Sequence, residues 1–257
     1  DPIIVHADVR RMLLTMKAFN EGNRALTYFT AQLLDTAHLS SDAAQRQEAE
    51  DLLAFLTPIC KAFMTETGLE VTNHGMQVFG GHGYIREWGM EQLARDARIA
   101  PIYEGTNGIQ ALDLLGRKVL GSQGKLLRGF TKLVHKFCAA NAEHPQLKAQ
   151  VEQLNQLNQQ WGELTMKVGM AAMKNPDEVG AAAVDYLMYS GYIILAYLWL
   201  RMAIAAQSHD DAAFAQAKLA TCDFYFKRLL PRTATHRAAV EAGSECLMSL
   251  PAQLFAL

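Results

Sequence analysis

The residues best suited to chemistry lie in one stretch, residues 76–112, whose glycine-rich turns interrupt an otherwise helical sequence. A carboxylate stands there among an aromatic residue and small residues, in the sequence Tyr103-Glu104-Gly105-Thr106. Such a setting suits a general base, because exclusion of water strengthens a carboxylate as a proton acceptor. A helix start beside it would present free N–H groups that suit a carbonyl oxygen or a phosphate.

A second feature is the sequence Gly80-Gly81-His82-Gly83, which ends an apolar helical pattern. Glycine permits positive φ and lets the backbone come close to a bulky ligand. A dinucleotide-binding fingerprint would need a preceding strand and G-x-G-x-x-G spacing, and neither is found here. Spacing alone leaves two interpretations open for each feature. The glycines form a tight turn or admit a cofactor, and Glu104 caps a turn or acts as a base.

Metal and nucleic-acid sites are not indicated by the sequence. The eight histidines do not share a helix face at metal-ligand spacing, and no Glu-x-x-His pair occurs, so we expect no metal site. His74 and His82 are expected to be polar packing residues. A net charge of −2, without long runs of one sign, argues against nucleic-acid binding. The four cysteines lack CxxC spacing, which predicts reduced, buried thiols at Cys60, Cys138, Cys222 and Cys246.

The elements that position these residues are predicted to be helices. Apolar residues three and four apart predict a long helix that begins at Asp8, taken as its N-cap. A second helical pattern runs from Leu52 to the paired glycines, and Pro58 predicts a kink or a break in it. Further helices are predicted near 90–99 and 107–120. Because no segment alternates as a strand would, the predicted fold class is all-α.

The sequence Gly-Ser-Gln-Gly at 121–124 predicts a boundary between two helical domains, residues 1–120 and 121–257. Five helices are expected in the second domain, near residues 125–142, 147–173, 177–207, 210–230 and 235–249. The cluster Lys227, Arg228, Arg232 and Arg237 predicts a solvated or C-terminal helix face, with a contact to CoA phosphates as the alternative.

One segment of the second domain, residues 186–206, is apolar enough to suggest a membrane span. Its uncharged part, from Tyr186 to Leu200, is shorter than the roughly 20 residues that cross a bilayer. We therefore predict a buried core helix and no membrane span.

Two motifs, QVFGGHGYIRE and LARDARIAPIYEGTNGIQ, together resemble the paired signatures near the carboxyl end of acyl-CoA dehydrogenases. The resemblance covers residues 1–120 and implies the C-terminal helical-bundle domain of that family. Residues 121–257 resemble, more weakly, the extra helical domain of longer bacterial members. Nothing in the chain resembles the family's N-terminal helical domain or its middle β domain. We therefore expect the C-terminal part of a longer enzyme, inactive by itself.

The resemblance implies an FAD-dependent enzyme that dehydrogenates an acyl-CoA thioester to the trans-2-enoyl-CoA. Glu104 would remove the α-proton, its backbone N–H would donate to the thioester carbonyl, and the β-hydride would pass to FAD. Tyr103 and Gly105 would line the acyl channel. Thr106 and Asn107 would reach the phosphate end of the cofactor.

The resemblance also implies partners. Residues Gln77, Val78, Phe79, Gly80 and Gly81 would contact the FAD of a neighbouring subunit, which implies a homodimer or a dimer of dimers. An electron-transfer flavoprotein would accept the electrons. Separately, the reduced thiols predict a cytoplasmic location. Two alternatives stay open. An acyl-CoA oxidase shares the fold, but its glutamate usually stands in an EGDN-like context, and a non-catalytic helical assembly module is the other.

Overall fold

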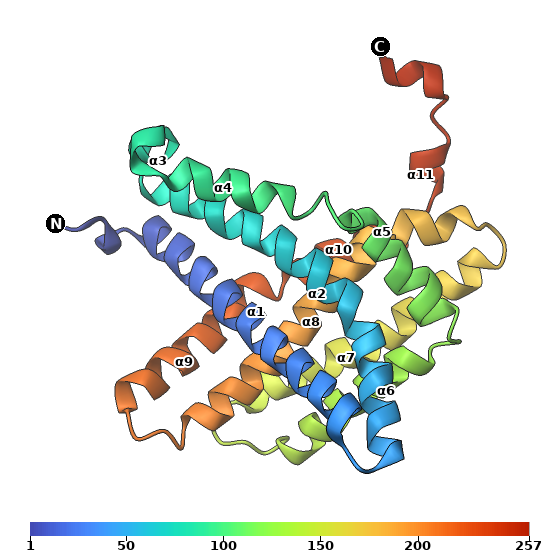
Figure 1. Cartoon of the computed structure of the whole chain (residues 1–257), viewed down its shortest axis with the longest axis horizontal. Helices are drawn as coiled ribbons and strands as arrows, with labels where there is room; N and C mark the ends of the chain where they lie inside the picture. Colours follow the sequence, from blue (N-terminus) through green and yellow to red (C-terminus); the bar gives the residue numbers. More distant parts are fainter. Residues whose placement is uncertain (257) are drawn as a thin grey trace.

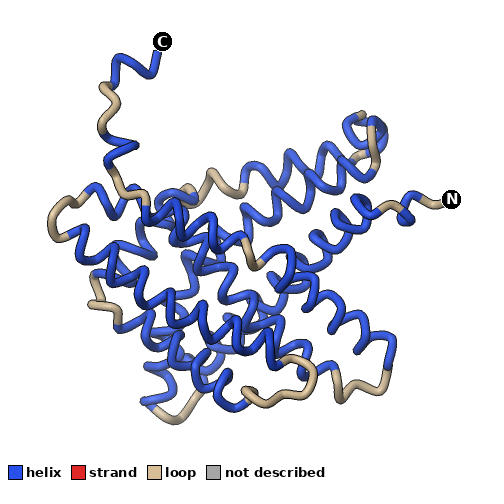
Figure 2. The backbone as a smooth tube through the Cα atoms, turned by 180° about the vertical axis from the view of Figure 1, so that it is seen from behind, coloured by secondary structure: helices blue, strands red, loops and turns tan. Residues whose placement is uncertain are grey.

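Helices and their connecting loops make up the backbone of residues 1–256, which the computed structural model describes (Figure 2). No strand occurs in that range, so the predicted all-α fold class is confirmed. In chain order the elements are η1 (Ile3–Val5), α1 (Ala7–Leu39), α2 (Ala43–Val78), α3 (Gly81–Tyr84), η2 (Arg86–Trp88), α4 (Met90–Ile99), α5 (Asn107–Leu112), η3 (Asp113–Leu120), α6 (Lys125–Ala140), α7 (Lys148–Ala172), α8 (Asp177–Ala206), α9 (Ala212–Phe224), η4 (Tyr225–Leu229), α10 (Arg232–Glu241), α11 (Glu245–Met248) and η5 (Ala252–Ala256).

The structure corrects two details of the long N-terminal helices. Helix α1 begins at Ala7 with His6 as its N-cap, and Asp8 lies in the first turn, where a carboxylate complements the helix dipole. Of the kink or break predicted at Pro58, the break does not occur, because helix α2 continues through this residue. Proline removes one backbone hydrogen bond, but the neighbouring Phe55 and Ile59 are fully buried, and this packing holds the helix together.

Helix α8 is the central helix, and it packs against α1, α2, α5, α7, α9 and α10 (Figure 1). Together with α2 it is one of two helices in residues 1–256 that are long and apolar enough to cross a membrane. Its most apolar window is 78% buried inside the protein, and every residue from Tyr189 to Leu200 is buried. This confirms the predicted buried core helix, since the helices around it already cover its apolar surface.

The two predicted domains contribute to one hydrophobic core. Gly191 of α8 faces Phe63 of α2, and a Cβ atom at Gly191 would lie 2.2 Å from the Phe63 ring. Nearby, the Trp199 indole N–H donates to the Ala18 carbonyl of α1 at 3.2 Å. The domain boundary at 121–124 therefore stays a prediction. In the structure, α1 and α2 of the first predicted domain pack directly on α8 of the second.

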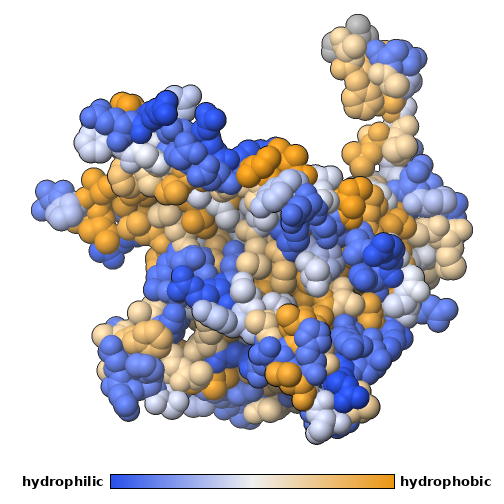
Figure 3. All heavy atoms as spheres, in the orientation of Figure 1, coloured by the Kyte–Doolittle hydropathy of each residue, from blue (hydrophilic) through white to orange (hydrophobic). Residues whose placement is uncertain are grey.

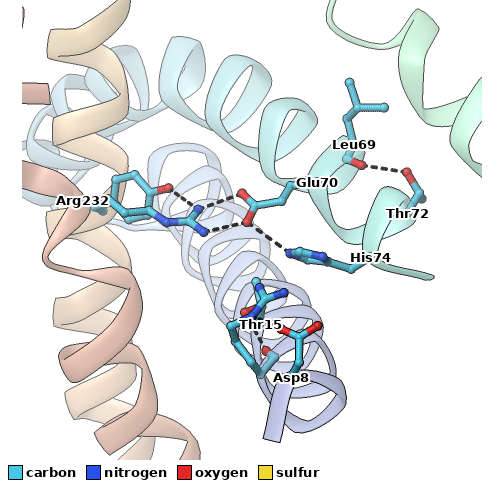
Figure 4. A network of polar contacts seen from close by, with 9 residues as sticks. Asp8, Thr15, Leu69, Glu70, Thr72, His74 and Arg232 are labelled. Carbon is cyan, nitrogen blue, oxygen red and sulfur yellow. Dashed lines mark hydrogen bonds and ion pairs between the residues drawn. The ribbon is translucent and has the colours of Figure 1, made fainter. Parts of the chain in front are cut away.

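A polar link also joins α2 to the C-terminal region (Figure 4). Arg232 of α10 donates to both carboxylate oxygens of Glu70, at 2.7 and 2.8 Å, and to the Tyr192 hydroxyl at 3.1 Å. The hydrogen bonds to Glu70 raise the pKa of Arg232. His74 Nε2 lies 3.5 Å from the same carboxylate. The predicted solvated face is therefore wrong for Arg232, which forms a half-buried ion pair between distant helices.

We expect Arg232→Ala to lower the free energy of unfolding by about 1–3 kcal/mol, because it leaves the half-buried Glu70 carboxylate without its cation. Urea denaturation would measure the change. Arg228→Ala is the matched control, because Arg228 is exposed and forms no ion pair among the described residues. A loss no larger than that of the control would show that the link contributes nothing. In a double-mutant cycle, adding Glu70→Gln should cost less in the Arg232→Ala background than alone.

The C-terminal prediction of one helix over 235–249 was wrong, because Gly243 takes a φ of +75° and separates α10 from α11.

The cysteine prediction needs one correction. Cys60, Cys138 and Cys222 are partly or fully buried, and burial raises their pKa values to about 11, 11 and 12. Cys246 is exposed.

Candidate functional site

The candidate site is built on the hairpin formed by α2 and α4. Helix α2 ends at Val78, and Gly80 has a φ of +61°, which confirms that glycine ends this helix. A Cβ at Gly83 would lie 2.2 Å from the Met76 carbonyl oxygen, so the turn back toward α4 requires glycine there. Helix α4 then returns along α2 for 10 residues, or about 15 Å.

The predicted cofactor residues at 77–81 and the predicted base Glu104 therefore lie near opposite ends of α4 (Figure 1). The structure brings Tyr103 through Asn107 together in one loop, and it keeps Gln77 through Gly81 at the other end of the hairpin.

Glu104 has a backbone conformation that its residue type disfavours. Its φ is +53°, and the following Gly105 has a φ of +81°. A non-glycine residue in this region costs about 1–3 kcal/mol, and such residues concentrate at functional sites. Gln123, in the turn after η3, shares a φ of +53° without chemistry nearby. The backbone conformation alone therefore does not identify Glu104 as a base. Its surroundings have to be considered as well.

The loop that carries Glu104 is held at both ends. The Asn107 N–H donates to the Pro101 carbonyl at 3.0 Å, and the Thr106 hydroxyl donates to the same oxygen at 3.3 Å. Gln110 of α5 reaches back to the Glu104 carbonyl at 3.5 Å. A Cβ at Gly105 would lie 2.8 Å from the Gln110 amide nitrogen. The absence of a side chain at Gly105 therefore lets Gln110 approach the Glu104 carbonyl.

The Asn107 side chain fixes the start of α5 to α2. Its oxygen accepts from Lys61 Nζ at 2.8 Å, and its nitrogen donates to Glu66 Oε1 at 2.8 Å and Thr65 Oγ1 at 3.0 Å. The amide predicted to reach a cofactor phosphate is thus committed to α2. Sequence reasoning missed Lys61, Glu66 and Thr65, since no local pattern connects residues more than 40 positions apart.

We expect Asn107→Ala to lower the free energy of unfolding by about 1–3 kcal/mol, because it leaves several partly buried partners on α2 without their hydrogen bonds. Chemical denaturation would measure this loss. Gln47→Ala, which removes an exposed amide on the same α2 helix, should change stability by less than about 0.5 kcal/mol. Equal effects of the two substitutions would contradict the anchoring role.

The Glu104 side chain itself is free to act on a ligand. It is exposed, and no described residue in 1–256 hydrogen-bonds or ion-pairs with its carboxylate. Nor do the backbone N–H groups of Glu104, Gly105 and Thr106 have an acceptor within that range. Tyr103 is half exposed beside them. A carboxylate next to several free donors can take a proton while the donors bind a neighbouring carbonyl oxygen.

The stretch that includes both ends of the hairpin exposes many large apolar side chains. Exposed apolar side chains are the kind that a partner or a ligand covers. They are Phe79, Tyr84, Ile85, Trp88, Leu93, Ile99, Ile102, Tyr103, Ile109 and Leu112. The Glu104 loop contains two of them, Ile102 and Tyr103.

The residues at 77–81 fit a large flat cofactor at the other end. A Cβ at Gly80 or Gly81 would meet nothing within 4 Å, so the backbone is open on that side. Phe79 is 51% exposed beside it and offers an aromatic surface.

His74 and His82, predicted as packing residues, contact Glu70 and the Trp88 ring respectively. No group of three metal-binding side chains occurs within the described chain.

Comparison with known proteins places the chain in a family. Residues 1–120 match the family "Acyl-CoA dehydrogenase, C-terminal domain", and residues 130–251 match "Acetyl-CoA dehydrogenase C-terminal like". The chain is 38% identical, over 96% of its length, to 3-methylmercaptopropionyl-CoA dehydrogenase of Ruegeria pomeroyi. It is 30% identical, over 98% of its length, to a butyryl-CoA dehydrogenase of Syntrophomonas wolfei.

The chain spans 43% of each of these two relatives. Among solved structures, Caenorhabditis elegans ACDH-11 in complex with C11-CoA is similar in fold, with a TM-score of 0.65 at 22% identity. That similarity covers 92% of this chain and 39% of the other. Both halves of the chain are thus matched, and the chain belongs to the acyl-CoA dehydrogenase family, of which it has the C-terminal helical regions.

Proposed function

We propose that this chain is the part of an acyl-CoA dehydrogenase that supplies the catalytic base, Glu104. The observation that carries the proposal is an exposed carboxylate without a partner, held at positive φ beside three free backbone N–H groups. Family membership supports the reaction class, α,β-dehydrogenation of an acyl-CoA thioester.

In this proposal the thioester carbonyl accepts a hydrogen bond from the Glu104 N–H. The bond withdraws electrons from the α-carbon and makes its proton more acidic, and the Glu104 carboxylate then takes that proton. Tyr103 and Gly105 lie on either side and would border the acyl chain. FAD, when bound, would supply the acceptor for the β-hydride.

Glu104 is exposed to solvent in this chain, and a solvated carboxylate is a weak base for such a proton. We infer that substrate, cofactor and further protein cover the exposed apolar side chains of residues 79–112 and exclude water there. The Gln77–Gly81 segment would contact the FAD of a neighbouring subunit in a homodimer or a dimer of dimers. Thr106 would approach a phosphate, and an electron-transfer flavoprotein would remove the electrons.

The test is an anaerobic titration of flavin absorbance with acyl-CoAs, on the protein expressed from its natural start. Two relatives are named for short substrates, 3-methylmercaptopropionyl-CoA and butyryl-CoA, so the titration begins with short chains and continues to long ones. Loss of the flavin absorbance at a chain length defines the substrate class. Admitting air then distinguishes an oxidase from a dehydrogenase, because the flavin of an oxidase regains its absorbance rapidly in oxygen. A protein that binds no flavin would contradict the proposal.

A further inference from the structure

The loop between α4 and α5 is not held in place by packing. Its residues 102–106 are all exposed. Figure 3 shows hydrophobic side chains on the surface where α4 ends, and Ile99, Ile102 and Tyr103 are each about half exposed there. Buried apolar contacts therefore do not fix the position of Glu104, and the two ends of the loop have to do so.

The two ends of the loop are Pro101 and Asn107. Pro101 is buried after the end of α4, and Asn107 is the first residue of α5. They meet, because the Asn107 N–H donates to the Pro101 carbonyl at 3.0 Å. The position of Glu104 relative to the helical body is thus set by α4 on one side and by the contacts of Asn107 on the other.

The Asn107 amide lies between opposite charges on α2. Lys61 Nζ donates to its oxygen at 2.8 Å, and its nitrogen donates to Glu66 Oε1 at 2.8 Å. Neither Lys61 nor Glu66 forms an ion pair within residues 1–256, so Asn107 is the polar partner of both side chains. The ammonium requires an acceptor and the carboxylate requires a donor, and together they hold the amide in one orientation.

This arrangement leaves Asn107 without a donor for a phosphate. An asparagine amide carries two N–H groups. Both are used on α2, by Glu66 Oε1 and by Thr65 Oγ1, the second at 3.0 Å. The expected contact between Asn107 and the phosphate end of FAD therefore does not fit the structure.

We propose that Lys61 and Glu66 are positioning residues for the proposed base, and that they act through Asn107. The two charges fix Asn107, and Asn107 fixes the end of the loop that places the Glu104 carboxylate and its N–H. A displacement of about 1 Å can slow a reaction about 10²-fold. This inference rests on the proposed function, because it concerns the placement of the same base.

Reversing the polarity at Asn107 tests the proposal on the flavin-loaded protein expressed from its natural start. Asn107→Asp keeps the shape and the bond from Lys61, but it sets a second carboxylate against Glu66. We expect flavin reduction at saturating acyl-CoA to slow at least about tenfold per bound flavin, with little change in acyl-CoA affinity. A loss of folded protein alone would not change the rate per bound flavin.

A compensating substitution should restore the rate. Glu66→Gln added to Asn107→Asp should bring the rate to within about threefold of the parent, because the glutamine amide donates to the new carboxylate. Glu48→Gln is the matched control, since Glu48 is an exposed glutamate of α2 about 27 Å from Glu66. Added to Asn107→Asp, it should restore nothing.

Lys61→Met removes the cation and keeps the apolar stem, and it should slow flavin reduction at least about threefold. Parental rates per bound flavin in Asn107→Asp and Lys61→Met, or equal rates of the two double variants, would overturn the proposal. Loss of flavin from Asn107→Asp at an unchanged rate per bound flavin would also overturn it, because Asn107 would then bind the cofactor.

Glu104→Gln, measured in the same series, separates this inference from the proposed function. A slow Glu104→Gln beside a parental Asn107→Asp would overturn the positioning role alone. A Glu104→Gln that reduces flavin at the parental rate would overturn the base, and the positioning role with it.

Discussion

Glu104→Gln is expected to slow anaerobic flavin reduction by acyl-CoA about 10²–10⁴-fold, the range that a positioned general base contributes. Glutamine keeps nearly the same shape and the backbone N–H, so binding of acyl-CoA should change little. The reaction loses its proton acceptor, because no other described carboxylate stands in the 101–106 loop. Stopped-flow absorbance would measure the rate, and a binding titration would measure affinity.

The control for this substitution is Glu87→Gln, which makes the same change at another exposed glutamate of the hairpin. It should reduce flavin at the parental rate. A rate for Glu104→Gln equal to that of this control would show that a different group removes the proton. The loop would then be a connection between α4 and α5 with no chemical role.

Gly191→Ala is expected to lower the free energy of unfolding by about 1–3 kcal/mol, the usual cost of overpacking a core. The new Cβ would lie 2.2 to 2.7 Å from three atoms of the Phe63 ring. Phe63 cannot move away freely, because it is fully buried and its ring packs edge-on against Tyr192. Thermal or urea unfolding would measure the loss.

Gly180→Ala is the matched control on the same helix, since a Cβ there meets nothing within 4 Å. Alanine is the better helix former, so this variant should gain up to about 1 kcal/mol. The opposite signs of the two substitutions separate packing from helix propensity. A similar effect of both would contradict a tight contact between α2 and α8, and with it a core shared by residues 1–120 and 121–257.

Periodicity in the sequence was sufficient to predict most of the long helices and the burial of α8. The apolar segment around Tyr186–Leu200 is the central helix, because a helix that is apolar on all sides must be buried on all sides. The glycines at 80 and 81 end α2 as predicted, since their backbone freedom is a local property. Local signals of this kind are fully present in a single sequence.

Contacts between residues far apart in the chain could not be predicted from local patterns in the sequence. Arg232 and Glu70 are 162 positions apart, and a basic cluster on one helix gives no sign of an acid on another. The hydrogen bonds that join the Asn107 side chain to α2 were missed for the same reason. Positive φ at Glu104 was also unexpected, because the residue type disfavours it and only the loop around it imposes it. The residues named for the site came from the family resemblance, and their roles remain predictions.

The most direct test of the central claim is α-proton exchange without oxidation. 3,3-Dimethylbutanoyl-CoA has α-hydrogens but no hydrogen on its β-carbon, so it can lose a proton and cannot transfer a hydride. We would incubate it with the flavin-loaded protein in D₂O and follow deuterium uptake by mass spectrometry. The account predicts exchange with the parent and with Glu87→Gln, and almost none with Glu104→Gln. Equal exchange in all three proteins would contradict the assignment of Glu104 as the base.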